Sequence, residues 1–84
     1  MTAFVYMLRC RDGTLYTGWT YDIEKRLKAH NDGTGSKYTR SRRPVSLCYV
    51  EECADKRAAL RRECEIKKMP RHKKILLMTA EKNF

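Results

Sequence analysis

Five polar side chains in this sequence have types that could act together on a phosphate group: Tyr6, Tyr16, Arg26, His30 and Glu63. The two tyrosines are ten residues apart, and Arg26 and His30 are four apart, so on a helix both would project from nearly one side. Hydrolysis of a phosphodiester requires an activated water, neutralisation of the phosphoryl charge and a stabilised leaving oxygen. The planar guanidinium of arginine can bind two phosphate oxygens. A single glutamate suits Mg²⁺, which prefers oxygen ligands and keeps several waters.

Taken one at a time, these residues have ordinary explanations. Tyrosines in strands more often belong to a core or an interface. A single arginine, histidine or glutamate on a helix is usually solvated or packed. The chemical interpretation therefore depends on the elements that would bring the five side chains together.

The two tyrosines lie in segments that predict a β-hairpin. Residues 3–10 and 14–19 are rich in β-branched and aromatic types, and the Asp12-Gly13 pair between them is a signal for a tight turn. Paired strands would place Tyr6 and Tyr16 near each other across the hairpin.

Alternation along the first strand assigns its side chains to two faces. Tyr6 and Leu8 share one face, and Val5 and Met7 share the other. Gly18, at the end of the second strand, removes a side chain where another group needs to approach closely.

A helix is expected to follow the hairpin. Either Thr20 or Asp22 can cap it, and it runs to about Asn31. Its inward-facing positions recur at helical spacing: Ile23, Leu27 and His30.

The rest of the chain predicts a loop, a strand and two helices. The segment 31–44 has glycines, hydroxyls and basic residues without apolar periodicity, which indicates a surface loop. Residues 45–50 predict a third strand, and residues 51–54 predict a turn. Asp55 caps a second helix, and Pro70 ends it or opens a short third helix. The apolar residues of this last helix are expected to cover the remaining edge of the core: Ile75, Leu76, Leu77 and Met78.

These elements predict a single α+β domain over residues 1–84, because a chain of this length has room for one core. Its fold is expected to be a three-stranded antiparallel sheet flanked by helices, in the order β-β-α-β-α-α.

The chain is strongly basic, with 19 Lys plus Arg against 10 Asp plus Glu and a net charge of +9. Such a charge is typical of proteins that bind a phosphate backbone. A solubility surface, or a patch for acidic proteins or lipid headgroups, would also explain it. The residues expected to contact nucleic acid, with the tyrosine able to stack on a base, are Lys37, Tyr38, Arg40, Arg42, Arg43, Lys67 and Lys68. Further cations that would add to this grip are Arg61, Arg62, Arg71, Lys73 and Lys74.

The four cysteines form no C-x-x-C pair, and none has ligand spacing from His30 or His72, so a structural zinc site is not expected. They are interpreted as buried free thiols of a reducing compartment. The N-terminus has no long apolar run and predicts neither a signal peptide nor a transmembrane helix. A cytoplasmic protein is expected.

The candidate residues also form a recognisable order: Tyr, Tyr-x-Gly, Arg-x-x-x-His and Ala-Leu-x-x-Glu-x-x-Ile-Lys. This order, in VYMLRCRDGTLYTGWTYDIEKRLKAHNDG and ALRRECEIKK, resembles the GIY-YIG nuclease superfamily, above all its small, stand-alone single-domain members. The resemblance extends from Phe4 to about Leu77, and the triplet Val5-Tyr6-Met7 admits two registers against the first motif. It implies a sheet-and-helix fold that hydrolyses a phosphodiester bond with one divalent cation, Mg²⁺ or another such as Mn²⁺.

The resemblance implies a role for each candidate. Tyr6 resembles the tyrosine that acts as, or relays to, the general base, and Tyr16 the tyrosine that positions water or phosphate. Arg26 resembles the arginine that stabilises the phosphoryl charge, and His30 the helix residue that assists proton transfer. Glu63 resembles the sole protein ligand of the metal. Because a free tyrosine has a pKa near ~10, Tyr6 would need a nearby cation or a proton relay through water.

The favoured hypothesis is a metal-dependent endonuclease for DNA, including structured or damaged DNA, with targeting supplied by a protein partner or by DNA shape. Three alternatives remain open from the sequence. One is a nucleic-acid-binding module that keeps the fold with little or no cleavage. The others are a small RNA-associated factor and a protein-interaction domain whose basic face meets acidic partners.

Overall fold

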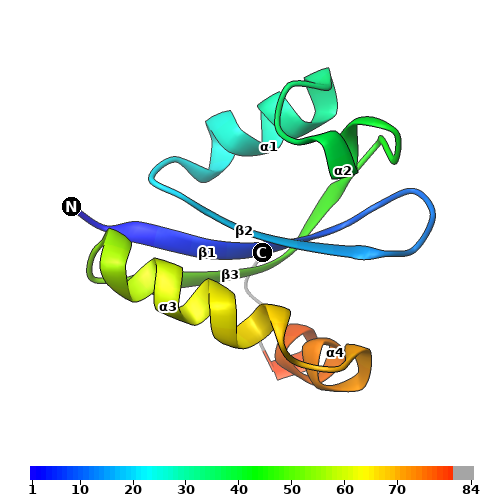
Figure 1. The fold of residues 1–84 in the computed structure, drawn as a ribbon. Helices are drawn as coiled ribbons and strands as arrows, with labels where there is room; N and C mark the ends of the chain where they lie inside the picture. The colour runs from blue at the N-terminus through cyan, green and yellow to red at the C-terminus, as the bar shows by residue number, and fades with distance from the viewer. Residues whose placement is uncertain (81–84) are drawn as a thin grey trace.

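A computed structural model describes residues 1–80 and contains a three-stranded antiparallel sheet (Figure 1). Its strands are β1 (Ala3–Arg9), β2 (Leu15–Thr20) and β3 (Ser46–Cys53). β1 is the central strand, in the order β2-β1-β3, and it pairs antiparallel with both neighbours. The predicted hairpin is confirmed, and its register places Tyr6 opposite Gly18.

Within the described residues, four helices cover the sheet: α1 (Ile23–Asp32), α2 (Lys37–Arg40), α3 (Lys56–Lys67) and α4 (Arg71–Ala80). Figure 1 shows α1 and α2 on one face of the sheet, and α3 and α4 on the other. The carboxylates of Asp22 and Asp55 cap α1 and α3 by accepting hydrogen bonds from backbone N–H groups of the first turn, at 3.1 and 2.8 Å. Such caps satisfy donors that a helix leaves without a partner.

The predicted fold class is confirmed: the chain is α+β, with a three-stranded antiparallel sheet between helices. Two local predictions were wrong. The segment 31–44 is not entirely loop, because Ser36 caps the single turn of α2. Residues 51–54 do not simply turn, because β3 continues to Cys53 and pairs Glu51 with Val5. Glutamates are tolerated there because β3 is an edge strand.

Each face of the sheet has its own core. On the α3 and α4 face, the buried residues are Ala3, Val5, Met7, Tyr49, Cys53, Ala59 and Ile66. On the α1 face they are Tyr6, Leu8, Cys10 and Val45, with Tyr16, Ile23, Leu27 and Leu47 packed against them. The alternation expected for β1 is therefore confirmed, and it directs Tyr6 toward α1.

The α4 prediction was half right. Leu77 and Met78 pack against the core, but Ile75 and Leu76 are 37% and 64% exposed. A short helix at the margin of the sheet can bury only one side, so its consecutive apolar residues cannot all face inward.

All four cysteines are free thiols, as expected, but only Cys10 and Cys53 are buried, and Cys64 is exposed on α3. Within residues 1–80, no helix combines the length and the apolar content needed to cross a membrane.

Candidate active site

Tyr6 is at the centre of the candidate site. Its side chain is 2% exposed, and its hydroxyl lies 2.8 Å from Nε2 of His30 on α1. The ring passes over Gly18 in the neighbouring strand, where a Cβ would lie 2.7 Å from the Tyr6 oxygen. The close approach expected at Gly18 is therefore made by the Tyr6 ring itself.

Tyr16 completes an aromatic cluster with Tyr6 and His30. Its ring centroid lies 6.5 Å from that of Tyr6 and 5.1 Å from that of His30, with the Tyr16 and His30 rings edge to face. The expected proximity of the two tyrosines is thus present. The helical spacing that predicted His30 as inward-facing is also confirmed, because this side chain is fully buried.

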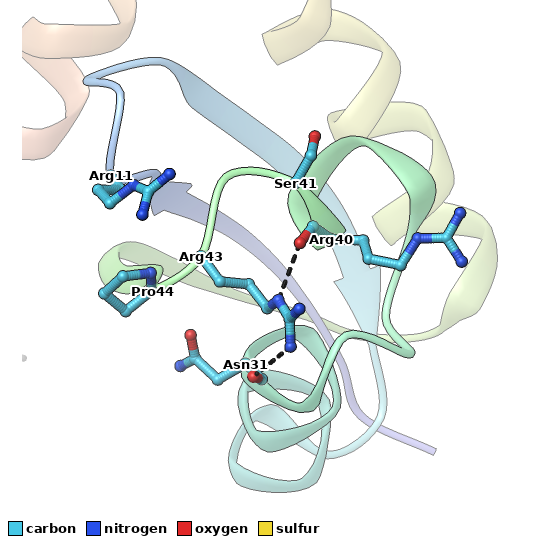
Figure 2. A pocket seen from close by; sticks show the side chains of 6 residues that line it. All are labelled: Arg11, Asn31, Arg40, Ser41, Arg43 and Pro44. Atoms are coloured by element: carbon cyan, nitrogen blue, oxygen red, sulfur yellow. Dashed lines mark hydrogen bonds between the residues drawn. The ribbon is translucent and has the colours of Figure 1, made fainter.

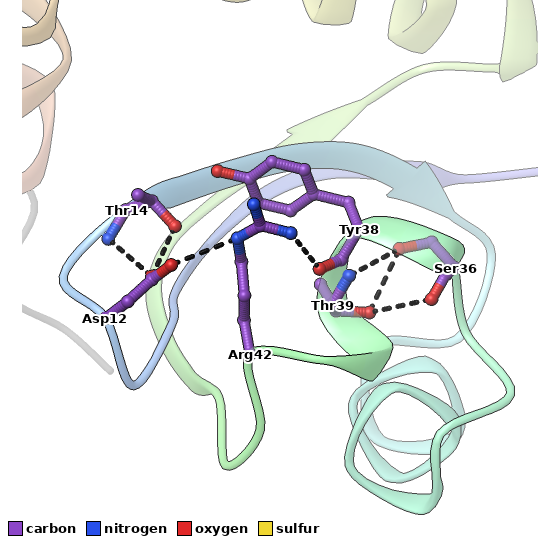
Figure 3. Close-up of polar contacts among 6 residues, drawn as sticks. All are labelled: Asp12, Thr14, Ser36, Tyr38, Thr39 and Arg42. Atoms are coloured by element: carbon purple, nitrogen blue, oxygen red, sulfur yellow. Dashed lines mark hydrogen bonds and ion pairs between the residues drawn. The ribbon is translucent and has the colours of Figure 1, made fainter.

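Thr39 and Ser36 extend this cluster and were missed by the sequence analysis. Nδ1 of His30 lies 2.7 Å from the Thr39 hydroxyl, which lies 3.0 Å from the Ser36 hydroxyl. Figure 3 shows Ser36 and Thr39 together in the turn of α2. The available signal was a serine three residues before a threonine, the spacing of an N-cap and its target N–H. It was overlooked because α2 is too short to show periodicity.

Charges from two helices act on the Tyr6 hydroxyl. Burial, followed by Tyr16, raises the pKa of Tyr6 to about 12. The guanidinium of Arg26 lowers this pKa, by its charge and as a hydrogen-bond donor, and the Glu63 carboxylate raises it further. Burial and the charge of Arg26 lower the pKa of His30, so the imidazole is neutral at physiological pH. All five candidates are therefore coupled through the Tyr6 phenol.

Glu63 projects from α3 with its side chain 15% exposed, and its Oε2 lies 2.9 Å from Nζ of Lys67. Both residues line a pocket of about 370 Å³, together with Leu60, Cys64 and Lys68. Glu65 differs from Glu63 because it is 59% exposed and pairs with Arg62 at 3.2 Å. It faces solvent, as expected.

Glu63 could serve as the single protein ligand of a magnesium ion, but the described residues do not form a site in which protein side chains supply all the ligands. No group of three or more His, Cys, Asp or Glu side chains converges within residues 1–80. Mg²⁺ commonly uses one or two carboxylates and completes its shell with water and substrate oxygens. Glu63, a largely buried glutamate at an open pocket, meets that requirement, because the ion pair with Lys67 engages only its Oε2.

Tyr38 and Arg42, which are expected at a nucleic-acid interface, contact each other. The Arg42 guanidinium carbon lies 3.9 Å from the centre of the Tyr38 ring, and the Tyr38 ring stacks on Tyr16 at 5.9 Å. Figure 3 shows Arg42 bridging the Tyr38 carbonyl and Asp12 of the hairpin turn, at 2.9 and 3.0 Å. This arrangement ties α2 to the hairpin. The Arg42 guanidinium covers one face of the Tyr38 ring.

A second pocket, of about 480 Å³, is lined by arginines and contains no carboxylate (Figure 2); its residues are Arg11, Asn31, Arg40, Ser41, Arg43 and Pro44. Arg43 is held in place by the carbonyls of Arg40 and Asn31, at 2.8 and 3.4 Å. The sequence analysis anticipated Arg40 and Arg43 here but missed Arg11, which lies in the hairpin turn 29 positions before Arg40. Figure 2 shows the Arg40 side chain extending away from Arg43.

Comparison with known proteins gives concordant results. The model of a family described as "GIY-YIG catalytic domain" matches residues 2–75. A UPF0213 protein of Clostridium perfringens is 53% identical over 78 residues, which cover 93% of this chain and 84% of that protein. A UPF0213 protein of Staphylococcus saprophyticus is 51% identical over 76 residues, covering 90% of this chain and 93% of that protein. The solution NMR structure of a UPF0213 protein from Bacillus halodurans superposes with a TM-score of 0.63 at 42% identity, covering 96% of this chain and 86% of that one.

Proposed function

This chain belongs to the GIY-YIG family, and we propose that it is a divalent-metal-dependent endonuclease that hydrolyses phosphodiester bonds, with DNA as its favoured substrate. The observation that carries this proposal is the buried 2.8 Å hydrogen bond between the Tyr6 hydroxyl and Nε2 of His30. Arg26 and Glu63 act on the same hydroxyl. A buried phenol that is bonded to a neutral imidazole, and on which the charges of Arg26 and Glu63 act, is suited to moving a proton next to a negatively charged substrate.

Tyr6 would act by relaying a proton rather than by ionising first. With a pKa of about 12, only roughly one Tyr6 in 10⁵ is phenolate at pH 7. A relay avoids this low population. The Tyr6 oxygen takes a proton from the attacking water while its own proton passes to Nε2 of His30, so no free phenolate accumulates.

Arg26 would stabilise the charge that builds up on the phosphoryl group. It is exposed on α1, and its guanidinium is close enough to Tyr6 and His30 to lower both pKa values. Its planar group can bind two phosphate oxygens at once. Tyr16, packed at the edge of the His30 ring, would position the water or the phosphate.

Glu63 would hold the divalent cation, with water and substrate oxygens as the other ligands. When bound, such a cation supplies positive charge to the phosphoryl and leaving oxygens. Lys67 neutralises Glu63 in the absence of the cation. This pairing explains how a largely buried carboxylate is accommodated on α3.

The second pocket, called the arginine pocket below, would bind backbone phosphates at some distance from the bond that is cut. Arg11 and Arg43 bring two cations together in a pocket without a carboxylate, and Lys37 is exposed on the same face of the sheet. Contacts of this kind to phosphate position a strand but do not read its sequence.

The test is Mg²⁺-dependent cleavage of supercoiled, nicked, branched and single-stranded DNA, with RNA in the same panel. Glu63→Gln keeps the size of the side chain and removes its charge. Glu65→Gln makes the same change on the exposed side of α3 and is the matched control. We expect cleavage by wild type and Glu65→Gln, none by Glu63→Gln or in the presence of a chelator, and DNA binding by all three proteins.

A nucleic-acid-binding module with little or no cleavage is the second candidate, and the Glu63–Lys67 ion pair is the observation that favours it. If this pair persists with DNA and metal present, only Oε1 of the carboxylate is left for a metal ion, and the Lys67 ammonium opposes metal binding there. Salt-sensitive binding by all variants, without cleavage by any of them at any Mg²⁺ or Mn²⁺ concentration, would decide for this candidate. Tighter binding of the RNA in the panel at matched salt would instead indicate an RNA-associated factor.

A further inference from the structure

His30 is a buried histidine with a partner on each ring nitrogen. Nε2 lies 2.8 Å from the Tyr6 hydroxyl, and Nδ1 lies 2.7 Å from the Thr39 hydroxyl. His30 and Thr39 are both fully buried. A neutral imidazole carries one proton, so one of these nitrogens donates and the other accepts. Which nitrogen carries the proton decides whether His30 can take a proton from Tyr6.

The Tyr6 side decides the direction of the bond at Nε2. Tyr6 is buried, and a buried phenol O–H needs an acceptor. Arg26 can only donate to the phenol oxygen, because a guanidinium has no acceptor. Within residues 1–80, Nε2 of His30 is the acceptor that the hydrogen bonds place next to Tyr6. The Tyr6 O–H therefore donates to Nε2.

The Thr39 hydroxyl is placed to accept a hydrogen bond from a proton on Nδ1 of His30. The Thr39 hydroxyl has oxygen acceptors in Ser36, whose hydroxyl lies at 3.0 Å and whose carbonyl lies at 3.5 Å. Its own hydrogen can therefore point to Ser36 while its oxygen accepts from Nδ1–H.

The backbone holds this geometry. The N–H of Thr39 donates to the Ser36 hydroxyl at 3.1 Å, which fixes the turn of α2. Gly35 lies against the His30 ring, where a Cβ would collide with Nδ1 and would lie 2.8 Å from the His30 Cα. A β-branched residue such as threonine has few rotamers, so its hydroxyl stays directed at the ring.

We infer that Thr39 is a positioning residue of the active site: it holds the proton of His30 on Nδ1 and so keeps Nε2 free to accept the proton of Tyr6. This inference deepens the proposed function and rests on it for its catalytic meaning. Its structural content, the tautomer of His30, can be measured without any activity. The neutral side chain of a free histidine in water prefers the proton on Nε2, so the bonds to Tyr6 and Thr39 together must supply the difference.

The first experiment is a long-range ¹H–¹⁵N NMR spectrum of the imidazole rings in the intact protein, near pH 7.5. The chain has two histidines, and His72→Gln, on the exposed side of α4, leaves His30 alone in the spectrum. We expect Nδ1 of His30 to be the protonated nitrogen in wild type and in Thr39→Ser. We expect the signal to move toward the Nε2–H form in Thr39→Val, which has the same shape without the hydroxyl.

Two outcomes would overturn the inference: a His30 that carries its proton on Nε2 in wild type, or a Thr39→Val protein whose His30 spectrum matches wild type. The wild-type spectrum decides by itself should Thr39→Val not fold. A protein that cuts no substrate would refute the proposed function and leave the tautomer result standing.

The second experiment applies to whichever substrate wild type cuts. We expect kcat to fall about 10- to 100-fold in Thr39→Val with KM nearly unchanged, as for residues that orient a catalytic histidine from behind. Thr39→Ser should restore most of the rate. A loss of rate in Thr39→Ser together with a wild-type rate in Thr39→Val would show that packing of the methyl group matters and the hydroxyl does not.

Discussion

Gly18 lies opposite Tyr6 in the pairing of β1 with β2, and the Tyr6 ring fills the space that a side chain at position 18 would occupy. A Cβ there would lie 2.7 Å from the Tyr6 oxygen, 2.9 Å from its Cζ and 3.2 Å from the Tyr16 ring. The tyrosine cannot move away without giving up the bond to His30. Gly18 therefore sets the position of the phenol, although it has no side chain of its own.

Gly18→Ala should accordingly damage both the packing and the site. We expect a loss of about 1–3 kcal/mol in the free energy of unfolding, the usual cost of overpacking, and a larger fractional loss of cleavage. Urea denaturation and initial rates measure the two effects. Gly13→Asn is the control, because position 13 has open space around it and a left-handed backbone that asparagine tolerates. A Gly18→Ala protein with wild-type stability and rate would show that the ring is free to shift.

Lys67 should compete with a metal ion for Glu63. Its ammonium lies 2.9 Å from Oε2, and an ion pair of this exposure contributes about 0.2–1 kcal/mol. Lys67→Met should therefore tighten Mn²⁺ binding, by up to about fivefold, in a calorimetric titration without substrate. Lys68→Met lines the same pocket without a salt bridge to Glu63 and should leave the affinity unchanged. Weaker Mn²⁺ binding by Lys67→Met would contradict the assignment of Glu63 as the ligand.

His30 should set the acid limit of activity and part of the acid limit of stability. Its folded-state pKa lies below the usual ~6.5, so Nε2 keeps its lone pair below that pH. The acid limb of kcat/KM should accordingly lie below pH 6.5. In the unfolded chain His30 binds its proton near pH 6.5. Its contribution to stability is therefore present above pH 6.5 and is lost as pH falls from there toward the lower folded-state pKa.

Thermal melting between pH 7.5 and 5 tests the stability part of this prediction. His30→Gln should flatten the loss of melting temperature over this range, and His72→Gln should leave it as in wild type because His72 is exposed. An acid limb of kcat/KM well above pH 6.5 would indicate a different titrating group.

The arginine pocket should appear in the salt dependence of DNA binding. Each lost phosphate contact lowers the slope of log K against log salt by about 0.9 for duplex DNA. Arg11→Gln and Arg43→Gln should each reduce the slope by about that amount. Arg57→Gln, an exposed arginine at the start of α3 on the opposite face of the sheet, should not. If the slopes for Arg11→Gln and Arg43→Gln, like that for Arg57→Gln, equal the wild-type slope, this pocket is excluded from the interface.

Local sequence patterns were sufficient to predict much of the fold and the positions of three candidate residues. The Asp-Gly turn between two β-rich segments predicted the hairpin. Asp55 predicted the start of α3, and the two candidate caps Thr20 and Asp22 predicted the start of α1, where Asp22 is the cap. The same reading placed Tyr6 and Tyr16 on paired strands and His30 on an inward face. These features depend on interactions between residues close in sequence, which is why sequence patterns reveal them.

Only the tertiary structure decided what surrounds these residues. α2 is a single turn, which is too short for a periodic pattern to predict it. Thr39 is buried only because this segment folds back over His30. Arg42 donates a hydrogen bond to Asp12, 30 positions away in the chain. The charge of Glu63 raises the pKa of Tyr6 only because α3 packs against the sheet. Contacts between distant segments depend on the packing of whole elements, and no spacing within one element specifies them. The sequence by itself therefore determined which residues could do the chemistry, and the packing of α1, α2 and α3 around the hairpin decided how they are held.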